Sequence, residues 1–322
     1  MVRNRDAHAG GPAWLLIDSH GVRGLLWCAT AVTVLILSVA ARAELPPTAV
    51  QQQPAAKSGD ATIDTVTVEA RRRRELLEHQ LSTFVSAITM PAGQESLVRW
   101  QLPICPLVAG LPFDEGKFVF QRVSQVASEA GVALGPPDCT PNLLVVMTRE
   151  PEAVLKNWWG KNPRMFNNDR GVAGIERMIR TPAPVRVFYN ACSVPAEMAN
   201  RFAISVIGHC GKPGIPDSRL TWSTVRVLYS VIIVVDKRQT EGLELGPLTD
   251  YIAMISLAHI RRNTDVGAAP TILRLFDEPD ASRPRVLSTW DRAFLKSLYD
   301  TGPSSVTHLS EIKRRMKRDV VR

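Results

Sequence analysis

Few residues of this chain have the type and spacing that chemistry needs. Residues 249–260, TDYIAMISLAHI, are typical of a helix that follows a buried strand, with His259 in the last turn. A helical zinc site needs two histidines one turn apart and a glutamate as general base, and this helix has neither, so we expect no metal there. The chain also has no G-x-S-x-G, phosphate-loop or G-x-G-x-x-G pattern, so serine-hydrolase and nucleotide chemistry lack support.

Two other places could carry chemistry. His259 precedes Arg261 and Arg262, where cationic groups suit the end of a helix, and a metal role would need ligands such as Asp265 from the next loop. The second place is a polar loop at residues 167–170, which comprises Asn167, Asn168, Asp169 and Arg170. Catalytic groups often lie in loops, but Asn and Asp also form turns readily, so both interpretations stay open.

Four cysteines follow the first forty residues, and an even number in an exported chain indicates disulfides. We favour the pairs Cys105–Cys139 and Cys192–Cys210, because each pair flanks one local unit. A zinc site built from all four is the alternative, but C-x-x-C spacing is missing. The stretch GHCGKPG around Cys210 resembles the nucleophile loop of chymotrypsin-like cysteine proteases, although the many short strands of that class are missing.

The amino-terminal residues have the pattern of an export signal. Arg23 precedes an apolar run at residues 24–40, and the small-x-small sequence ARA ends at Ala43, so we predict a signal peptide at residues 1–43 and a periplasmic protein. A membrane anchor at residues 24–40 is the alternative. The leader holds four arginines and two aspartates, so its loss would lower the net charge from +8 to about +6. The basic residues are spread along the chain, which argues against nucleic-acid binding.

Residues 44–74 are predicted to form a disordered linker, because Pro, Gln, Ala and Gly dominate its first part. The β-branched alternation of TIDTVTVEA at residues 62–70 favours a short strand. The stretch IDTVTVEARRR resembles the TonB box of outer-membrane receptors, a segment that lends a strand to an energising periplasmic protein. That resemblance implies a partner-binding edge at Thr65, Val66, Thr67 and Val68, whereas an edge strand or a tether is the alternative.

Residues 75–322 are predicted to form one mixed α+β domain stapled by disulfides. Three elements in succession predict a crossover unit: a strand ending at Cys105, a helix stopped by Gly131, and the apolar strand NLLVVMT. Further on, the pattern predicts a helix beginning near Pro151, strands in PVRVFYNA and TWSTVRVLYSVIIVVD, a helix begun by Pro247, a capping box at Ser288 and Asp291, and a basic last helix.

The carboxyl-terminal half resembles zincin-like metallopeptidases, and more closely a set of uncharacterised secreted proteobacterial proteins that share a degenerate form of it. The resemblance covers residues 225–299 and is carried by SVIIVVD, TDYIAMISLAHI, PTILRLF and LSTWDRAFLKSLY. It implies the scaffold without the catalysis, because Tyr251, Met254 and Ile255 stand where the ligands and base would fall. A convergent helix pair is the alternative.

The sequence therefore favours a non-enzymatic binding module without cofactor or metal, and an envelope hydrolase with an unrecognised site is the alternative. The basic stretches, Arg71 to Arg74 and KRRMKR at residues 313–318, are most simply solvated helix faces. Contact with an anionic membrane surface is their functional alternative. Trp158, Trp159 and Phe166 could form an exposed aromatic patch, but burial of at least one tryptophan is the favoured interpretation.

Overall fold

Apolar strands with helices on both faces form a layered α/β arrangement. The computed structural model describes residues 61–89, 97–166, 171–196, 224–261, 264–302 and 307–321. The expectations for residues 1–60, for the loop at 167–170 and for Cys210 lie outside these residues. Within the described part of the chain, no helix has the length and apolar character that a membrane crossing requires.

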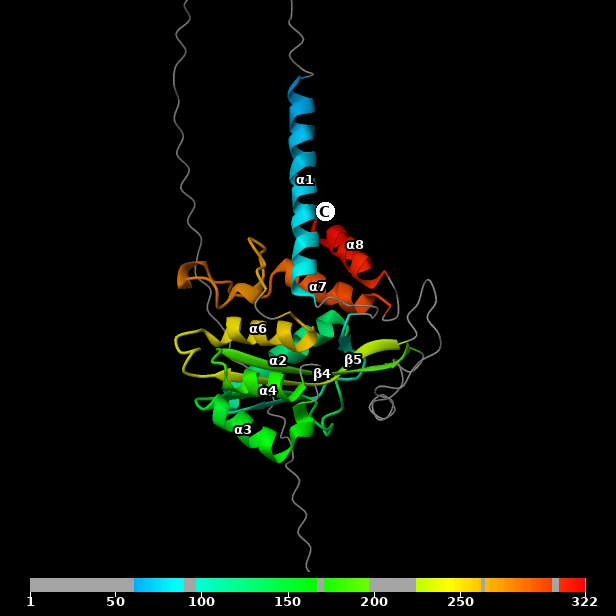
Figure 1. Ribbon diagram of the computed structural model, residues 1–322. Coiled ribbons are helices and arrows are strands. Elements are labelled where there is room, and N and C mark those ends of the chain that lie inside the picture. The colour runs from blue at the N-terminus through cyan, green and yellow to red at the C-terminus, as the bar shows by residue number, and fades with distance from the viewer. Residues whose placement is uncertain are drawn as a thin grey trace, which may run out of the picture. The chain divides into compact units, whose positions relative to one another are not determined.

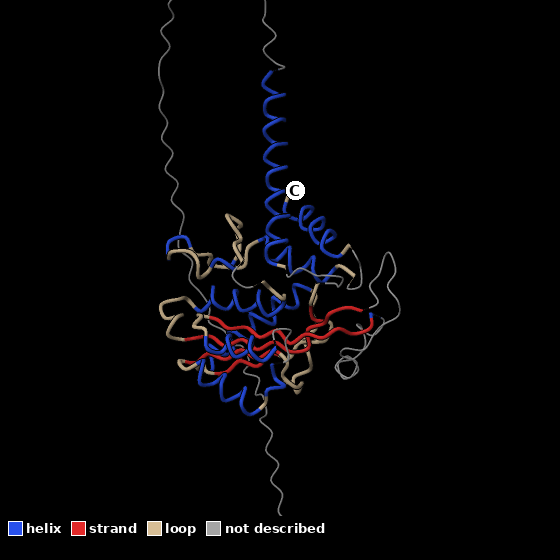
Figure 2. The backbone as a smooth tube through the Cα atoms, in the orientation of Figure 1, coloured by secondary structure: helices blue, strands red, loops and turns tan. Residues whose placement is uncertain are grey.

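The sheet is built around the long strand β5, Thr224–Asp236. Strand β4, Val185–Pro195, runs antiparallel along one edge of β5. Strand β3, Leu143–Thr148, runs parallel along the other edge, and β2, Pro106–Ala109, lies parallel beyond it. The two-residue strand β1, Arg99–Trp100, pairs with the first half of β5 on the same edge as β3. Figure 2 shows these strands as one layer between helices.

Alternating side chains of the sheet fill two cores. Val231, Ile233 and Val235 pack in the main core with helices α2 (Phe113–Ala130), α6 (Leu245–Leu257) and α7 (Thr289–Asp300). Ile232 and Val234 pack in a second core with α3 (Pro151–Lys161) and α4 (Gly171–Arg180), which cover the opposite face (Figure 1). Burial on both faces explains why the end of β5 is a continuous apolar run instead of an alternating one.

The predicted crossover unit is confirmed, and so is its disulfide. Strands β2 and β3 are parallel, α2 connects them, and Gly131 ends α2 with a φ of 87°. Cys105 and Cys139, which lie just ahead of β2 and β3, form a disulfide. Cys192 lies in β4 and is disulfide-bonded, but Cys210 is outside the described residues, so the pair Cys192–Cys210 stays a prediction.

The strand predicted at residues 62–70 is wrong, because helix α1 runs without a break over Ala61–Ile88. Thr65, Val66, Thr67 and Val68 therefore lie in a helix, and residues 61–74 of the predicted linker form its first half. Buried residues near the end of α1 anchor it in the main core, namely Leu81, Phe84, Val85 and Ile88. Ion pairs one turn apart, Arg71–Glu75 and Arg74–Glu78, favour the helix further, so anchoring and charge pairing outweigh the β-branched residues.

The remaining elements differ from the sequence predictions at two places and agree with them at two others. The strand expected to end at Cys105 is instead divided into β1 and β2, which lie on either side of that cysteine. Helix α6 ends at Leu257, so His259 follows the helix and does not lie in its last turn. The capping box at Ser288 and Asp291 is confirmed, and the basic last helix is α8, His308–Val320. The short helices η1 (Pro163–Phe166), η3 (Ile272–Arg274) and η4 (Asp280–Ser282) lie in the connections.

Candidate functional site

The carboxyl end of the parallel strands is where an enzyme with such a sheet usually binds its substrate. Asp236 is buried there at the end of β5, and its carboxylate accepts hydrogen bonds from the Arg238 backbone, the Arg238 guanidinium and the Gln239 amide at 3.0–3.2 Å. Burial alone would raise the pKa of Asp236, but these hydrogen bonds lower it below the ordinary value. The carboxylate is therefore an ionised turn anchor and a poor general base.

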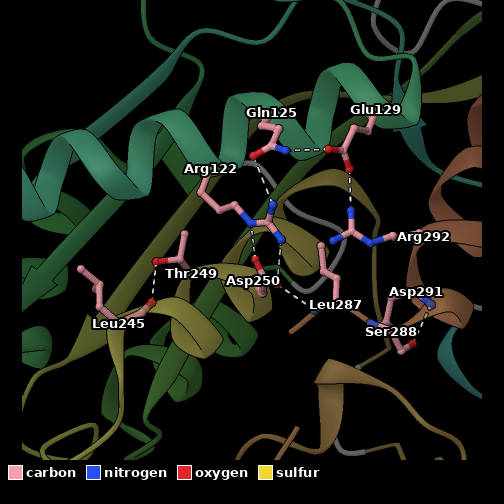
Figure 3. A network of polar contacts seen from close by, with 10 residues as sticks. All are labelled: Arg122, Gln125, Glu129, Leu245, Thr249, Asp250, Leu287, Ser288, Asp291 and Arg292. Carbon is pink, nitrogen blue, oxygen red and sulfur yellow. Dashed lines mark hydrogen bonds and ion pairs between the residues drawn. The ribbon is translucent and has the colours of Figure 1, made fainter. Parts of the chain in front are cut away.

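Two further buried carboxylates hold the fold together in the same way. Asp291 accepts hydrogen bonds from the Thr271 hydroxyl and from the backbone N–H groups of Ile272 and Ser288, at 2.5–2.9 Å, which joins η3 to the start of α7. Burial raises the pKa of Asp291, against the effect of these hydrogen bonds. Asp250 in α6 accepts from Arg122 at 2.6 and 3.0 Å and from the Leu287 N–H at 2.7 Å (Figure 3). Both carboxylates are committed to partners within the protein.

A groove lies between the first half of β4, helix α6 and a segment formed by residues 260–261 and 264–277, and we call it the β4–α6 groove. Its cavity has a volume of about 230 Å³. Its walls are mostly apolar or aromatic, and they include Val185, Val187 and Tyr189 from β4, Tyr251 and Ile255 from α6, and Ile260, Val266, Leu273 and Phe276 from the segment. Its polar lining consists of Arg261, Thr264 and Asp277. The side chains of the walls are thus mostly apolar, and polar atoms share the accessible lining with them.

The polar groups of the groove differ in their freedom to bind a partner. The Arg261 guanidinium donates a hydrogen bond to the Thr89 carbonyl at 2.8 Å, which fixes it against the end of α1. The Thr264 hydroxyl donates to the Arg261 carbonyl at 3.0 Å. The side chain of Asp277 is exposed, which leaves a carboxylate at the groove rim beside the T-shaped ring pair of Tyr251 and Phe276. The groove therefore offers apolar walls and one accessible negative charge.

Three aromatic side chains fix the end of α6 next to this groove. The Tyr189 hydroxyl donates to the Ile255 carbonyl at 2.9 Å, the Trp100 indole donates to the Ser256 carbonyl at 2.8 Å, and the Tyr299 hydroxyl donates to the Leu257 carbonyl. Carbonyls in the last turn of a helix have no partner within the helix. Burial raises the pKa of Tyr299, which keeps its phenol protonated as a donor. Three different elements, β4, β1 and α7, thus supply caps to one buried helix end.

Removing one of these caps should destabilise the protein measurably. Tyr189→Phe and Tyr299→Phe each leave a buried carbonyl without its side-chain donor while keeping the ring, so we expect a loss of about 1–3 kcal/mol in the free energy of unfolding. Denaturant unfolding monitored by circular dichroism measures the loss. If both variants unfold within about 0.5 kcal/mol of the wild type, the capping role is wrong, because that is the usual range of neutral substitutions.

The histidines and aspartates considered for a metal are not brought together. The His259 ring lies 4.4 Å from the Tyr189 ring in a tilted stack. Asp265 lines a separate crevice with His79 on α1, where its carboxylate accepts the Gly267 N–H at 2.7 Å. Across the described ranges, no group of three or more metal-ligating side chains is close enough to hold an ion.

The residues of α6 at the positions where a peptidase helix would carry its zinc ligands and general base pack against other parts of the fold. Met254 and Ile255 are buried in the main core, and the Tyr251 ring stands against Phe276. Trp158 and Trp159 are half-buried and pack against the second core, where Phe166 is fully buried. Thr67 and Val68 are exposed on α1.

No protein-family model matches the chain, no curated protein is similar to it, and no solved structure resembles it.

Proposed function

We propose that the protein is an exported, non-catalytic binding module that holds a short partner segment in the β4–α6 groove. The observation that carries this proposal is the contrast between that groove and the buried carboxylates. The groove has apolar walls and an accessible carboxylate, Asp277, whereas Asp236, Asp250 and Asp291 are all committed to partners within the fold. An enzyme that uses a carboxylate for acid–base chemistry needs one whose pKa and access suit proton transfer.

The chemistry of the groove indicates the kind of segment it binds. Apolar and aromatic side chains would fill the space between Val187, Tyr251 and Phe276. A lysine or arginine of the partner would pair with Asp277 at the rim. We therefore propose a partner segment that combines large apolar residues with one basic residue.

The compartment and the scaffold belong to the same proposal. The disulfide Cys105–Cys139 supports an oxidising compartment, which fits a periplasmic protein released from a signal peptide. Helix α6 follows β5, which is the order of the strand and the helix on which the zincin-like resemblance rests. We propose that α6 is the equivalent of the peptidase helix, with packing residues in place of zinc ligands.

A displayed library of random peptides tests the proposal directly. Peptides selected on the mature protein should bind with a tenfold or greater loss of affinity on Asp277→Lys, and on Thr264→Trp, which fills the groove. The matched control is Asp280→Lys, because this carboxylate is exposed in the adjacent helix η4 and does not line the groove. Equal affinity for Asp277→Lys and Asp280→Lys would place binding elsewhere. Turnover of casein or of a chromogenic ester by the purified protein would contradict the non-catalytic part.

A further inference from the structure

A buried cation lies where three elements meet at the carboxyl end of α7. Arg99 of β1 is 5% exposed, and its guanidinium donates to the Leu298 carbonyl in the last turn of α7. The guanidinium also lies over the Tyr299 ring, 5.8 Å from its centroid, while the Arg99 Nε has no partner. The end of a helix and an aromatic face both favour a cation, which explains how Arg99 is held without a carboxylate.

A buried histidine lies beside this arginine. His308 is the first residue of α8 and is 3% exposed, and neither ring nitrogen makes a hydrogen bond of normal geometry. Burial and then the charge of Arg99 lower the pKa of His308 to about 4, while the Leu298 carbonyl and Glu311 act in the opposite direction. His308 is therefore neutral near pH 7, and a proton on it would place two cations together in the core.

Helix α8 packs on the domain mainly through apolar side chains, because Leu309, Val320 and Val321 contact the main core in addition to its buried residues. Ile312 and Met316 are its other buried residues. Its charged contacts to α1 are Lys313 to the Ser86 hydroxyl at 2.6 Å and Lys317 to Glu78 at 3.4 Å, and Arg315 reaches Asp300 of α7 at 4.0 Å. These contacts are partly exposed, so each contributes little stability.

We propose that α8 is an acid-released latch, held docked while His308 stays neutral beside the buried Arg99 and freed when His308 takes up a proton. The groups that face His308 are Arg99 from β1, Tyr299 from α7, and Glu311 on α8 itself. Of these only Glu311 can carry a negative charge near neutral pH, and it is already paired with Arg315 at 3.0 Å. Release of α8 would uncover the apolar surface of α1 and α7 that Ile312 and Met316 now cover.

The direction of the pH effect follows from the two pKa values. A histidine freed into water has an ordinary pKa near 6.5, above the value of about 4 in the docked state. The docked state therefore keeps its full free-energy advantage over the released state above about pH 6.5, and it loses this advantage as the pH falls toward 4. Between pH 7 and pH 4.5, the ratio of released to docked α8 should rise on the order of fiftyfold.

Spin labels on α8 and the core test the latch. Nitroxides at Thr83→Cys on α1 and Arg314→Cys on α8 should give a narrow distance distribution at pH 7 and a broad one at pH 4.5. A control pair at Thr83→Cys and Phe113→Cys, which lies on α2, should stay narrow at both pH values, because only α8 moves. Adding His308→Gln should keep the α1–α8 distance narrow at both values. A distribution that stays narrow in the wild type, or that broadens equally with His308→Gln, overturns the proposal.

A second measurement covers the case in which His308→Gln fails to fold. The ring proton of His308, followed by NMR across pH 7 to 4 in the otherwise native protein, should keep the chemical shift of a neutral ring down to about pH 5 while α8 is docked. Titration near pH 6.5 with the α1–α8 distance unchanged would show that the site tolerates the proton, and would overturn the latch.

Discussion

Gly110→Ala is expected to abolish stable folding, with a loss of more than about 4 kcal/mol, in the exceptional range for a single substitution. Gly110 directly follows strand β2 and has a φ of 83°, which residues other than glycine adopt only with strain. A Cβ built on it would lie 2.0 Å from the backbone carbonyl oxygen of Met147 in the neighbouring strand β3. That carbonyl belongs to a paired strand in the middle of the sheet, so it cannot move aside as a flexible side chain would.

A matched glycine separates the steric part of this effect from the backbone part. Gly242 has the same φ of 83°, but a Cβ built on it would meet nothing within 4 Å. Gly242→Ala should therefore cost only the backbone strain, about 1–2 kcal/mol. Guanidinium unfolding and the yield of soluble protein measure both variants. Equal losses at the two positions would contradict the argument that the Met147 carbonyl excludes a side chain.

The individual elements of the domain could be predicted because their sequence signals are local. The apolar run that became β3, the glycine that ends α2 and the capping box of α7 each depend on neighbouring residues. The sheet order depends on pairing between distant segments, such as β1 with β5, and hydrophobic periodicity carries no information about it. The crossover of β2, α2 and β3 was predictable since a helix between two nearby strands favours a parallel pair.

Helix α1 shows how tertiary contacts override local propensity. The alternation in TIDTVTVEA favours a strand, but Leu81, Phe84, Val85 and Ile88 anchor the later turns in the core. Once those turns are helical, each added residue at the amino-terminal end gains one hydrogen bond without a new nucleation cost. Taken together, the alternating stretch at residues 62–70 and the helical pattern that follows it up to residue 88 favour one continuous helix.

The candidate site was beyond prediction for a different reason. Tyr189 lies in a strand pattern that reads as core, and Asp277 follows an apolar block that reads as packing. Only the fold places them beside Tyr251 in one groove. Arg99 and His308 likewise come from opposite ends of the domain, and nothing in their sequence neighbourhoods indicates that both are buried.

The ion pair between α2 and α6 gives the second large expected effect. Arg122→Met removes the guanidinium that binds both oxygens of Asp250, whose side chain is 3% exposed. The Leu287 N–H then remains as its one hydrogen-bond donor among the contacts in Figure 3. An uncompensated buried carboxylate typically costs 3–5 kcal/mol, so we expect a loss of about that size in the free energy of unfolding. The matched control is Arg285→Met, whose pair with Glu244 is 58% and 68% exposed and should contribute about 0–1 kcal/mol.

A double variant decides whether the loss of stability comes from the missing ion pair or from the Asp250 carboxylate that is left buried without a cation. Asp250→Leu combined with Arg122→Met removes both charges and fills the buried position, so it should recover more than about half of the loss caused by Arg122→Met alone. The Leu287 N–H would still lose its acceptor, which limits the recovery by about 1–3 kcal/mol. A double variant as unstable as Arg122→Met alone would mean that the loss comes from the missing pair itself, which then stabilises the contact of α2 with α6. Recovery would mean that Asp250 and Arg122 mainly fix how the two helices meet, since an apolar pair in their place would hold the helices together as firmly.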